Sequence, residues 1–108
     1  GSIQFGGGFQ ASLANVTADG NGTSAPRLTA FWNEVTLASN NDDVTLPESP
    51  VIGQMLYLRN KHGSHSLDVH KDAGSSTVNG GASAAVAAGK VALVIYVASN
   101  DWRLTVLN

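Results

Sequence analysis

Three histidines and a nearby aspartate are the residues whose types and spacing could do chemistry in this chain. His62 and His65 lie in or beside a tight turn, and Asp68 and His70 lie two residues apart on the segment that follows. Side chains two residues apart share one face of a strand, so Asp68 and His70 could form a metal pair or an acid–base pair. A metal site normally needs three or four ligands, and no other cluster in the sequence clearly supplies them. We therefore predict a polar outer face of a hairpin, with no metal and no cofactor.

The run Asn40-Asn41-Asp42-Asp43 offers the oxygen ligands that calcium prefers. It lacks the glycine and the glutamate that an EF-hand loop requires at fixed positions. We therefore predict a turn in which the Asn and Asp side chains bond to the backbone. The glycine run at residues 6–8 is not a phosphate loop, because no Lys-Ser or Lys-Thr pair follows it.

The sequence contains no arrangement typical of catalysis. The chain has no cysteine, which excludes thiol catalysis, disulfides and cysteine zinc sites. No serine is flanked as in a nucleophile elbow, and no pair of carboxylates stands out for acid–base work. The six lysines and arginines are dispersed and the formal net charge is -2, so the chain lacks the basic field that carries nucleic-acid binding. We predict a protein that is not an enzyme and that has no nucleic-acid partner.

Two tryptophans, Trp32 and Trp102, are candidate partner-binding residues. Together they could form a platform on which a sugar ring stacks. Packing in a core or an interface is the more usual role of tryptophan in a small β domain. The sequence leaves both roles open.

Short strands are the elements that must position these residues. From Arg27 onward, segments rich in Val, Thr and aromatic residues are separated by turn signals every eight to twelve residues, which is typical of a sandwich or barrel. We expect strands over residues 27–37, 44–46, 54–60, 66–71, 76–78, 83–87, 91–98 and 102–107. Residues 91–98 form the most hydrophobic segment and should be a central strand. Lys61–Ser64 should be a hairpin connection with Gly63 at positive φ. The fold class that we predict is all-β, a small antiparallel β-sandwich or jelly-roll-like barrel over residues 27–108.

Residues 1–26 are rich in Gly, Ala, Ser, Thr and Asn, and we predict an extended N-terminal arm. Ile3, Phe5 and Phe9 occupy odd positions, which lie on one face of an extended chain. These three residues, together with the two tryptophans, are our candidate partner-binding residues. The arm is expected to become ordered by lying against a neighbouring surface.

The composition favours a component of an assembly over a freely diffusing monomer. Charged residues make up 13% of the chain, against about 25% in an average domain, whereas the hydrophobic fraction of 43% is ordinary. A surface with so few charges is difficult to keep soluble on its own, so part of it should be covered by copies of the chain or by a partner. No apolar run approaches the roughly 18 residues needed to cross a bilayer, and the start lacks the features of a signal peptide. We expect no membrane partner.

A set of turn and core residues between Leu46 and Leu104 carries a resemblance to a known class of proteins. The set comprises Leu46-Pro47, Gly53-Gln54, Asn60, Leu67 to Val69, Val78-Asn79-Gly80, Ala88-Gly89-Lys90 and Trp102. This pattern resembles small β-sandwich structural proteins of tailed bacteriophages, among them capsid decoration proteins, and it covers a little over half of the chain. It bears on fold and context and identifies no catalytic residue.

The resemblance implies a virion protein that is made in the host cytoplasm and located on the capsid surface. The function that it favours is that of a capsid decoration (cement) protein, which binds and stabilises the phage head as a homo-oligomer. The partners would be the major capsid protein and other copies of the chain, with a trimer favoured because capsids offer quasi-threefold positions. The alternative is a fibre or spike domain that recognises a host-surface glycan through Trp32, Trp102 and polar loops.

Overall fold

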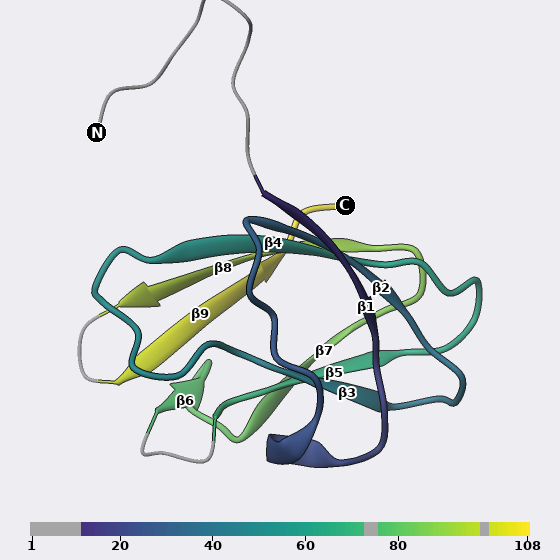
Figure 1. The fold of residues 1–108 in the computed structure, drawn as a ribbon, viewed down its shortest axis with the longest axis horizontal. Coiled ribbons are helices and arrows are strands. Elements are labelled where there is room, and N and C mark those ends of the chain that lie inside the picture. Colours follow the sequence, from purple (N-terminus) through teal and green to yellow (C-terminus); the bar gives the residue numbers. More distant parts are fainter. Residues whose placement is uncertain (1–11, 73–75, 98–99) are drawn as a thin grey trace, which may run out of the picture.

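The computed structural model describes residues 12–72, 76–97 and 100–108, and within these ranges the chain forms two packed β-sheets (Figure 1). The strands are β1 (Leu13–Thr17), β2 (Trp32–Thr36), β3 (Asp42–Thr45), β4 (Met55–Asn60), β5 (Leu67–His70), β6 (Thr77–Val78), β7 (Ser83–Val86), β8 (Val91–Val97) and β9 (Asp101–Val106), with a short 3-10 turn, η1 (Gly22–Ser24). The predicted all-β sandwich is confirmed. The candidate residues Ile3, Phe5 and Phe9 lie outside the described residues.

One sheet, here called the large sheet, has the order β1-β2-β4-β8-β9-β6, and the small sheet has the order β3-β5-β7. Alternate side chains of each sheet point into a shared core, as the period of two in a strand requires. Leu58 and Val94 of the large sheet and Leu67 and Val69 of the small sheet are fully buried there. Strand β8 lies between β4 and β9, in the interior position that its hydrophobic sequence predicts.

From β2 to β8, successive strands alternate between the two sheets. Strands β2 and β4 pair in parallel, as do β3 and β5. The expected antiparallel pairing occurs between β4 and β8, β8 and β9, and β5 and β7. The sandwich is therefore mixed and not purely antiparallel.

The predicted hairpin at Lys61–Ser64 is wrong, because β4 and β5 belong to different sheets. The segment crosses from one sheet to the other, and Gly63 is not at positive φ. Side-chain hydrogen bonds shape this crossing. His62 Nδ1 accepts hydrogen bonds from the backbone N–H groups of Ser64 (3.0 Å) and His65 (2.9 Å). The crossing therefore depends on a histidine acceptor and needs no left-handed glycine at this position.

The sequence predicts that the sandwich starts at residue 27, but the structure shows that it starts earlier, with β1. Strand β1 pairs in parallel with β2 along its whole length, and Val16 packs against the core. The following segment runs beside β3 through bridges that join Asp19 to Asp43 and Arg27 to Thr45. Residues 12–26 therefore belong to the folded domain.

The Val78-Asn79-Gly80 turn is attached to β9 by side chains. Asn79, at φ 52°, accepts a hydrogen bond from the Leu104 N–H (2.9 Å) and donates one to the Leu104 carbonyl (3.1 Å), as a neighbouring strand would. Asp101 Oδ1 accepts from the Thr77 hydroxyl (2.6 Å) and from the Gly80 N–H (3.0 Å). The Thr77 hydrogen bond lowers the pKa of the Asp101 carboxyl, with the Gly80 N–H and Arg103 acting in the same direction against burial.

Candidate functional site

The outer side of the large sheet carries a continuous apolar surface. The strand registers place Leu13, Trp32, Tyr57 and Leu93 opposite one another in a row that crosses four strands. Side chains directly opposite one another in a sheet are about 5 Å apart and in contact. We call the outward-facing hydrophobic residues of these strands the apolar face: Leu13, Trp32, Met55, Tyr57, Val91, Leu93, Ile95 and Val97.

Strand β8 shows most clearly that this face is unusual. Its inward side chains, Ala92, Val94 and Tyr96, are buried in the core. Its outward side chains are equally apolar and only half-buried. A strand that is hydrophobic on both sides is typical of a sheet covered on both faces, whereas the small sheet covers only the inner side here. The outer side of β8 is therefore as apolar as a side that packs against another layer.

Three aromatic rings cluster on the apolar face where β2 begins. Trp32 and Tyr57 are stacked with ring centroids 5.7 Å apart, and Phe31 meets Tyr57 edge-on at 5.3 Å. Trp32 Nε1 donates to Glu34 Oε2 (2.6 Å), and Glu34 pairs with Arg59 at 3.4 Å. An aromatic cluster bordered by charged residues is the usual make-up of a protein interface.

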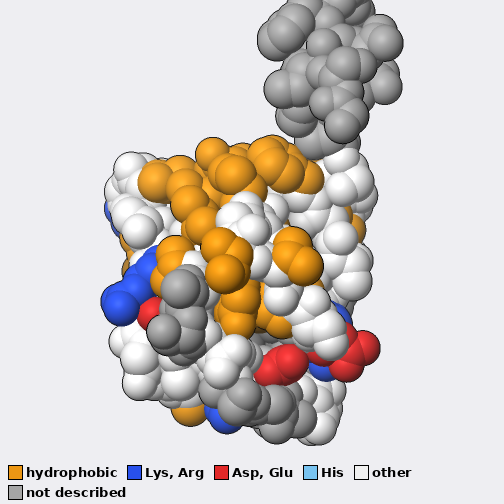
Figure 2. Space-filling view, turned by 90° about the vertical axis from the view of Figure 1, so that its left-hand side faces the viewer, with side chains coloured by type: hydrophobic (Ala, Val, Ile, Leu, Met, Phe, Trp, Pro, Cys, Tyr) orange, Lys and Arg blue, Asp and Glu red, His pale blue; other side chains and the backbone are white. Residues whose placement is uncertain are grey.

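The hydrophobic surface continues around the end of the sandwich where β4 begins. Val51 and Ile52 lie in the loop before β4 and are 67% and 75% exposed. The loop is held against β8, because the Gly53 N–H donates to the Tyr96 carbonyl (2.8 Å) and the Tyr96 N–H donates to the Gln54 carbonyl (2.8 Å). Figure 2 looks at this end and shows hydrophobic side chains gathered along its upper edge and across its centre.

Trp102 is not available to a partner. Its side chain is fully buried in the core, where its ring meets Tyr96 edge-on at 5.2 Å. Trp102 takes the inward position of β9 together with Leu104, whereas Trp32 takes an outward position of β2. The two tryptophans therefore lie on opposite sides of the large sheet and form no sugar platform. Of the sequence-predicted binding residues that the structure describes, Trp32 alone lies on the apolar face.

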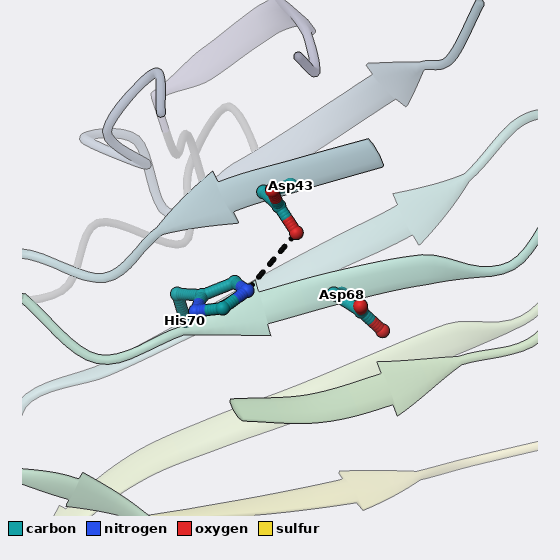
Figure 3. Close-up of side chains that lie close together, drawn as sticks. All are labelled: Asp43, Asp68 and His70. Atoms are coloured by element: carbon teal, nitrogen blue, oxygen red, sulfur yellow. Dashed lines mark ion pairs between the residues drawn. The ribbon is translucent and has the colours of Figure 1, made fainter. Parts of the chain in front are cut away.

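A second cluster, of titratable side chains, lies on the outside of the small sheet (Figure 3). Asp43 comes from β3, and Asp68 and His70 come from β5. His70 Nε2 lies 3.0 Å from Asp43 Oδ1. Each of the three residues offers one atom that could bind a metal ion, and these atoms lie within 4.8 Å of one another. The sequence brought Asp68 and His70 together but assigned Asp43 to a separate turn, whereas Asp43 lies in β3. The parallel register that places Asp43 beside Asp68 joins segments that are distant in the sequence.

Existing contacts already occupy much of this cluster. Asp43 Oδ2 accepts a hydrogen bond from the Gly22 N–H (2.9 Å) while Oδ1 faces His70. Burial raises the pKa of the Asp68 carboxyl, the nearby Asp43 carboxylate raises it further, and His70 opposes both. The three side chains could hold a metal ion as two carboxylates and one imidazole. The Asp43–His70 pair also accounts for the arrangement as a structural contact between β3 and β5.

Replacing Asp68 with asparagine is expected to stabilise the protein at neutral pH. A raised pKa in the folded state means that the native protein binds the proton more tightly than the unfolded chain does. Stability therefore falls as the pH rises through the window between the pKa of the unfolded chain and the higher pKa of the folded protein. Asparagine does not ionise, so the gain should appear above the window and disappear well below the ordinary aspartate pKa of about 3.9. Urea unfolding at both pH values measures it. The control Glu48→Gln removes an exposed charge and should change little; an Asp68→Asn variant that is less stable at neutral pH would contradict the prediction.

Adding EDTA is expected to leave the melting temperature unchanged. The Asp43 carboxylate already has the Gly22 N–H and His70 as partners, so the fold needs no cation to hold β3 against β5. Thermal unfolding followed by circular dichroism, with and without chelator, measures this. A loss of several degrees that zinc or calcium restores would show that the cluster is a metal site.

Within the described ranges, no helix is long and apolar enough to cross a bilayer. Comparison of the chain with protein-family models and with curated proteins finds no match.

Proposed function

We propose that this chain is a non-enzymatic structural protein of a virion, a capsid decoration protein that covers the head of a tailed bacteriophage as a homo-oligomer. The observation that carries this proposal is the apolar face. Strand β8 presents Val91, Leu93, Ile95 and Val97 on the side of the large sheet that the small sheet does not cover. Contiguous apolar surface of this kind on a small domain marks an interaction site.

The chemistry of the face suits a protein partner. The Leu13–Leu93 row contains no charged side chain, and the charged residues nearby, Glu34, Arg59 and Arg103, lie in the neighbouring rows. A desolvated centre with aromatic anchors and a polar rim is where binding free energy concentrates in protein interfaces. The stacked Trp32 and Tyr57 rings would be those anchors.

Composition and resemblance give the proposal its context. A charged fraction of 13% is low for a domain whose whole surface faces water. The resemblance to bacteriophage β-sandwich proteins favours the capsid surface as location and the major capsid protein as partner. It also favours a trimer, which matches the quasi-threefold positions of a capsid lattice.

Self-association is tested first by sedimentation equilibrium of the purified chain and of two variants. Leu93→Arg places a charge on the apolar face, on strand β8. The control Ala85→Arg places the same charge on the exposed outside of the small sheet. We expect trimers for the parent chain and for Ala85→Arg, and folded monomers for Leu93→Arg that keep the far-UV circular dichroism spectrum of the parent chain. A clean monomer of the parent chain at micromolar concentration would contradict the self-association.

The location is tested by cryo-EM of virions that carry the chain, together with quantification of the chain in purified particles. We expect density on the head and a fixed ratio to the major capsid protein. Density confined to a tail fibre, or specific binding of a glycan on the Trp32 and Tyr57 rings, would overturn decoration and favour the fibre or spike alternative. Absence of the chain from the particles would overturn both.

A further inference from the structure

We propose that the apolar face of one copy is covered by residues 1–11 of a second copy. This inference rests on the proposed homo-oligomer, and it identifies the segment that covers the apolar face of each copy in that oligomer. The N-terminal segments would thus tie the copies together.

The direction in which the chain enters β1 carries the first step. The Ser12 carbonyl accepts a hydrogen bond from the Trp32 N–H (3.1 Å), and Ser12 Oγ accepts one from the Phe31 N–H (2.9 Å). Ser12 therefore still follows the ladder between β1 and β2. The segment before Ser12 starts in line with β1, beyond the first residue of β2, and not folded back over the row from Leu13 to Leu93. This direction favours a neighbouring copy over that row of its own sheet.

The chemistry of the segment carries the second step. Residues 1–11 contain no charged side chain and include three large hydrophobic ones, Ile3, Phe5 and Phe9. The row from Leu13 to Leu93 likewise contains no charged side chain. A partner with many charges would lose hydration on this surface without gaining ion pairs. An uncharged segment with alternate apolar residues has no such cost.

Reach carries the third step. Eleven extended residues span about 36 Å at the usual rise per residue. Four neighbouring strands are about 19 Å wide at the usual strand spacing. The segment is therefore long enough to leave its own sheet, reach an adjacent copy and cross the row of four strands on that copy. Leu13 is 64% exposed and is the first residue of the row. The N-terminal segment of each copy therefore begins beside that copy's own apolar face, where the segment of a neighbouring copy would lie.

Disulfide trapping tests the proposal. The chain has no cysteine of its own, so every disulfide that forms joins introduced cysteines. One preparation carries Gln4→Cys and a second carries Thr105→Cys, which ends the row beside Leu93. Both changes leave the hydrophobic residues of the segment and of the face in place. The control is Ala85→Cys, on the outside of the small sheet. Mixing Gln4→Cys with Thr105→Cys should give a disulfide between copies about 100-fold faster than mixing it with Ala85→Cys, because contact raises the effective concentration.

Two results would overturn the proposal. One is an equal rate for Thr105→Cys and Ala85→Cys. The other is an intramolecular disulfide in the dilute Gln4→Cys/Thr105→Cys double variant, which would place the segment on its own sheet.

The outcome of this experiment is separable from the test of the proposed function. Trapping between copies without decoration of heads would leave the inference standing and overturn the function, whereas decoration without trapping would do the reverse.

Discussion

Replacing Asn60 with alanine is expected to lower the free energy of unfolding by about 3–5 kcal/mol, because buried main-chain groups lose their hydrogen-bond partner. Asn60 is fully buried at the end of β4. Its Nδ2 donates to the carbonyls of His65 (2.9 Å) and Val86 (3.0 Å), and its Oδ1 accepts from the His62 N–H (3.0 Å). One side chain on the large sheet therefore holds both the crossing segment and β7 of the small sheet.

Urea or thermal unfolding measures this effect, and Asn15→Ala is the matched control. Asn15 lies on the exposed outer side of β1, so its replacement should cost less than about 0.5 kcal/mol, as surface substitutions usually do. A loss below about 1 kcal/mol for Asn60→Ala would show that water replaces the side chain at these groups.

Deleting residues 1–9 is expected to leave the melting temperature within a few degrees of the parent chain and to weaken attachment sharply. The first strand begins at Leu13, so every strand of the described sandwich survives the deletion. Burying Ile3, Phe5 and Phe9 contributes about 5–8 kcal/mol of gross transfer free energy. Ordering some ten residues costs about 10 kcal/mol or more. The entropic cost exceeds the gain, so the segment should bind firmly only where backbone hydrogen bonds to a neighbour are added.

Sedimentation of the truncated chain and its occupancy on particles measure this prediction. A full-length variant with Ile3, Phe5 and Phe9 all replaced by serine is the matched control, since it keeps the length of the segment and removes its hydrophobic side chains. It should behave like the deletion. If the truncated chain still decorates particles at full occupancy, attachment runs through the sandwich itself, and Trp32 is the first residue to replace.

Local alternation was enough to predict most strands. Residues 54–60, 66–71 and 91–98 were expected to be strands, and the structure has them as β4, β5 and β8 within one or two residues. The reason is that each segment shows its inward side chains at every second position, a property of the segment alone. The alanine-rich run at residues 82–88 contains β7. The glycines on both sides of this run leave too few residues for a stable helix.

Which strands become neighbours could not be predicted in the same way. Pairing of β3 with β5, and hence the approach of Asp43 to Asp68 and His70, depends on crossings between sheets that no local pattern encodes. The same holds for Trp32 and Trp102. Both lie in alternating segments, and which side of each strand faces the core depends on where the small sheet lies.

The alternation of strands between the two sheets also has a consequence for how the chain folds. Strands β2, β3, β4, β5 and β7 each pair with partners that lie at least one full strand away in the sequence, apart from the contact of β2 with β1. Such non-local pairing gives a high contact order, which places folding in the millisecond-to-second range typical of all-β domains. Among the described strands, β8 and β9 are the antiparallel pair that is consecutive in the chain. Closing their short loop costs little entropy, so we expect the β8–β9 hairpin to form early in folding. The hydrophobic outward side chains of β8 would then be exposed to other unfolded chains before the sandwich is complete.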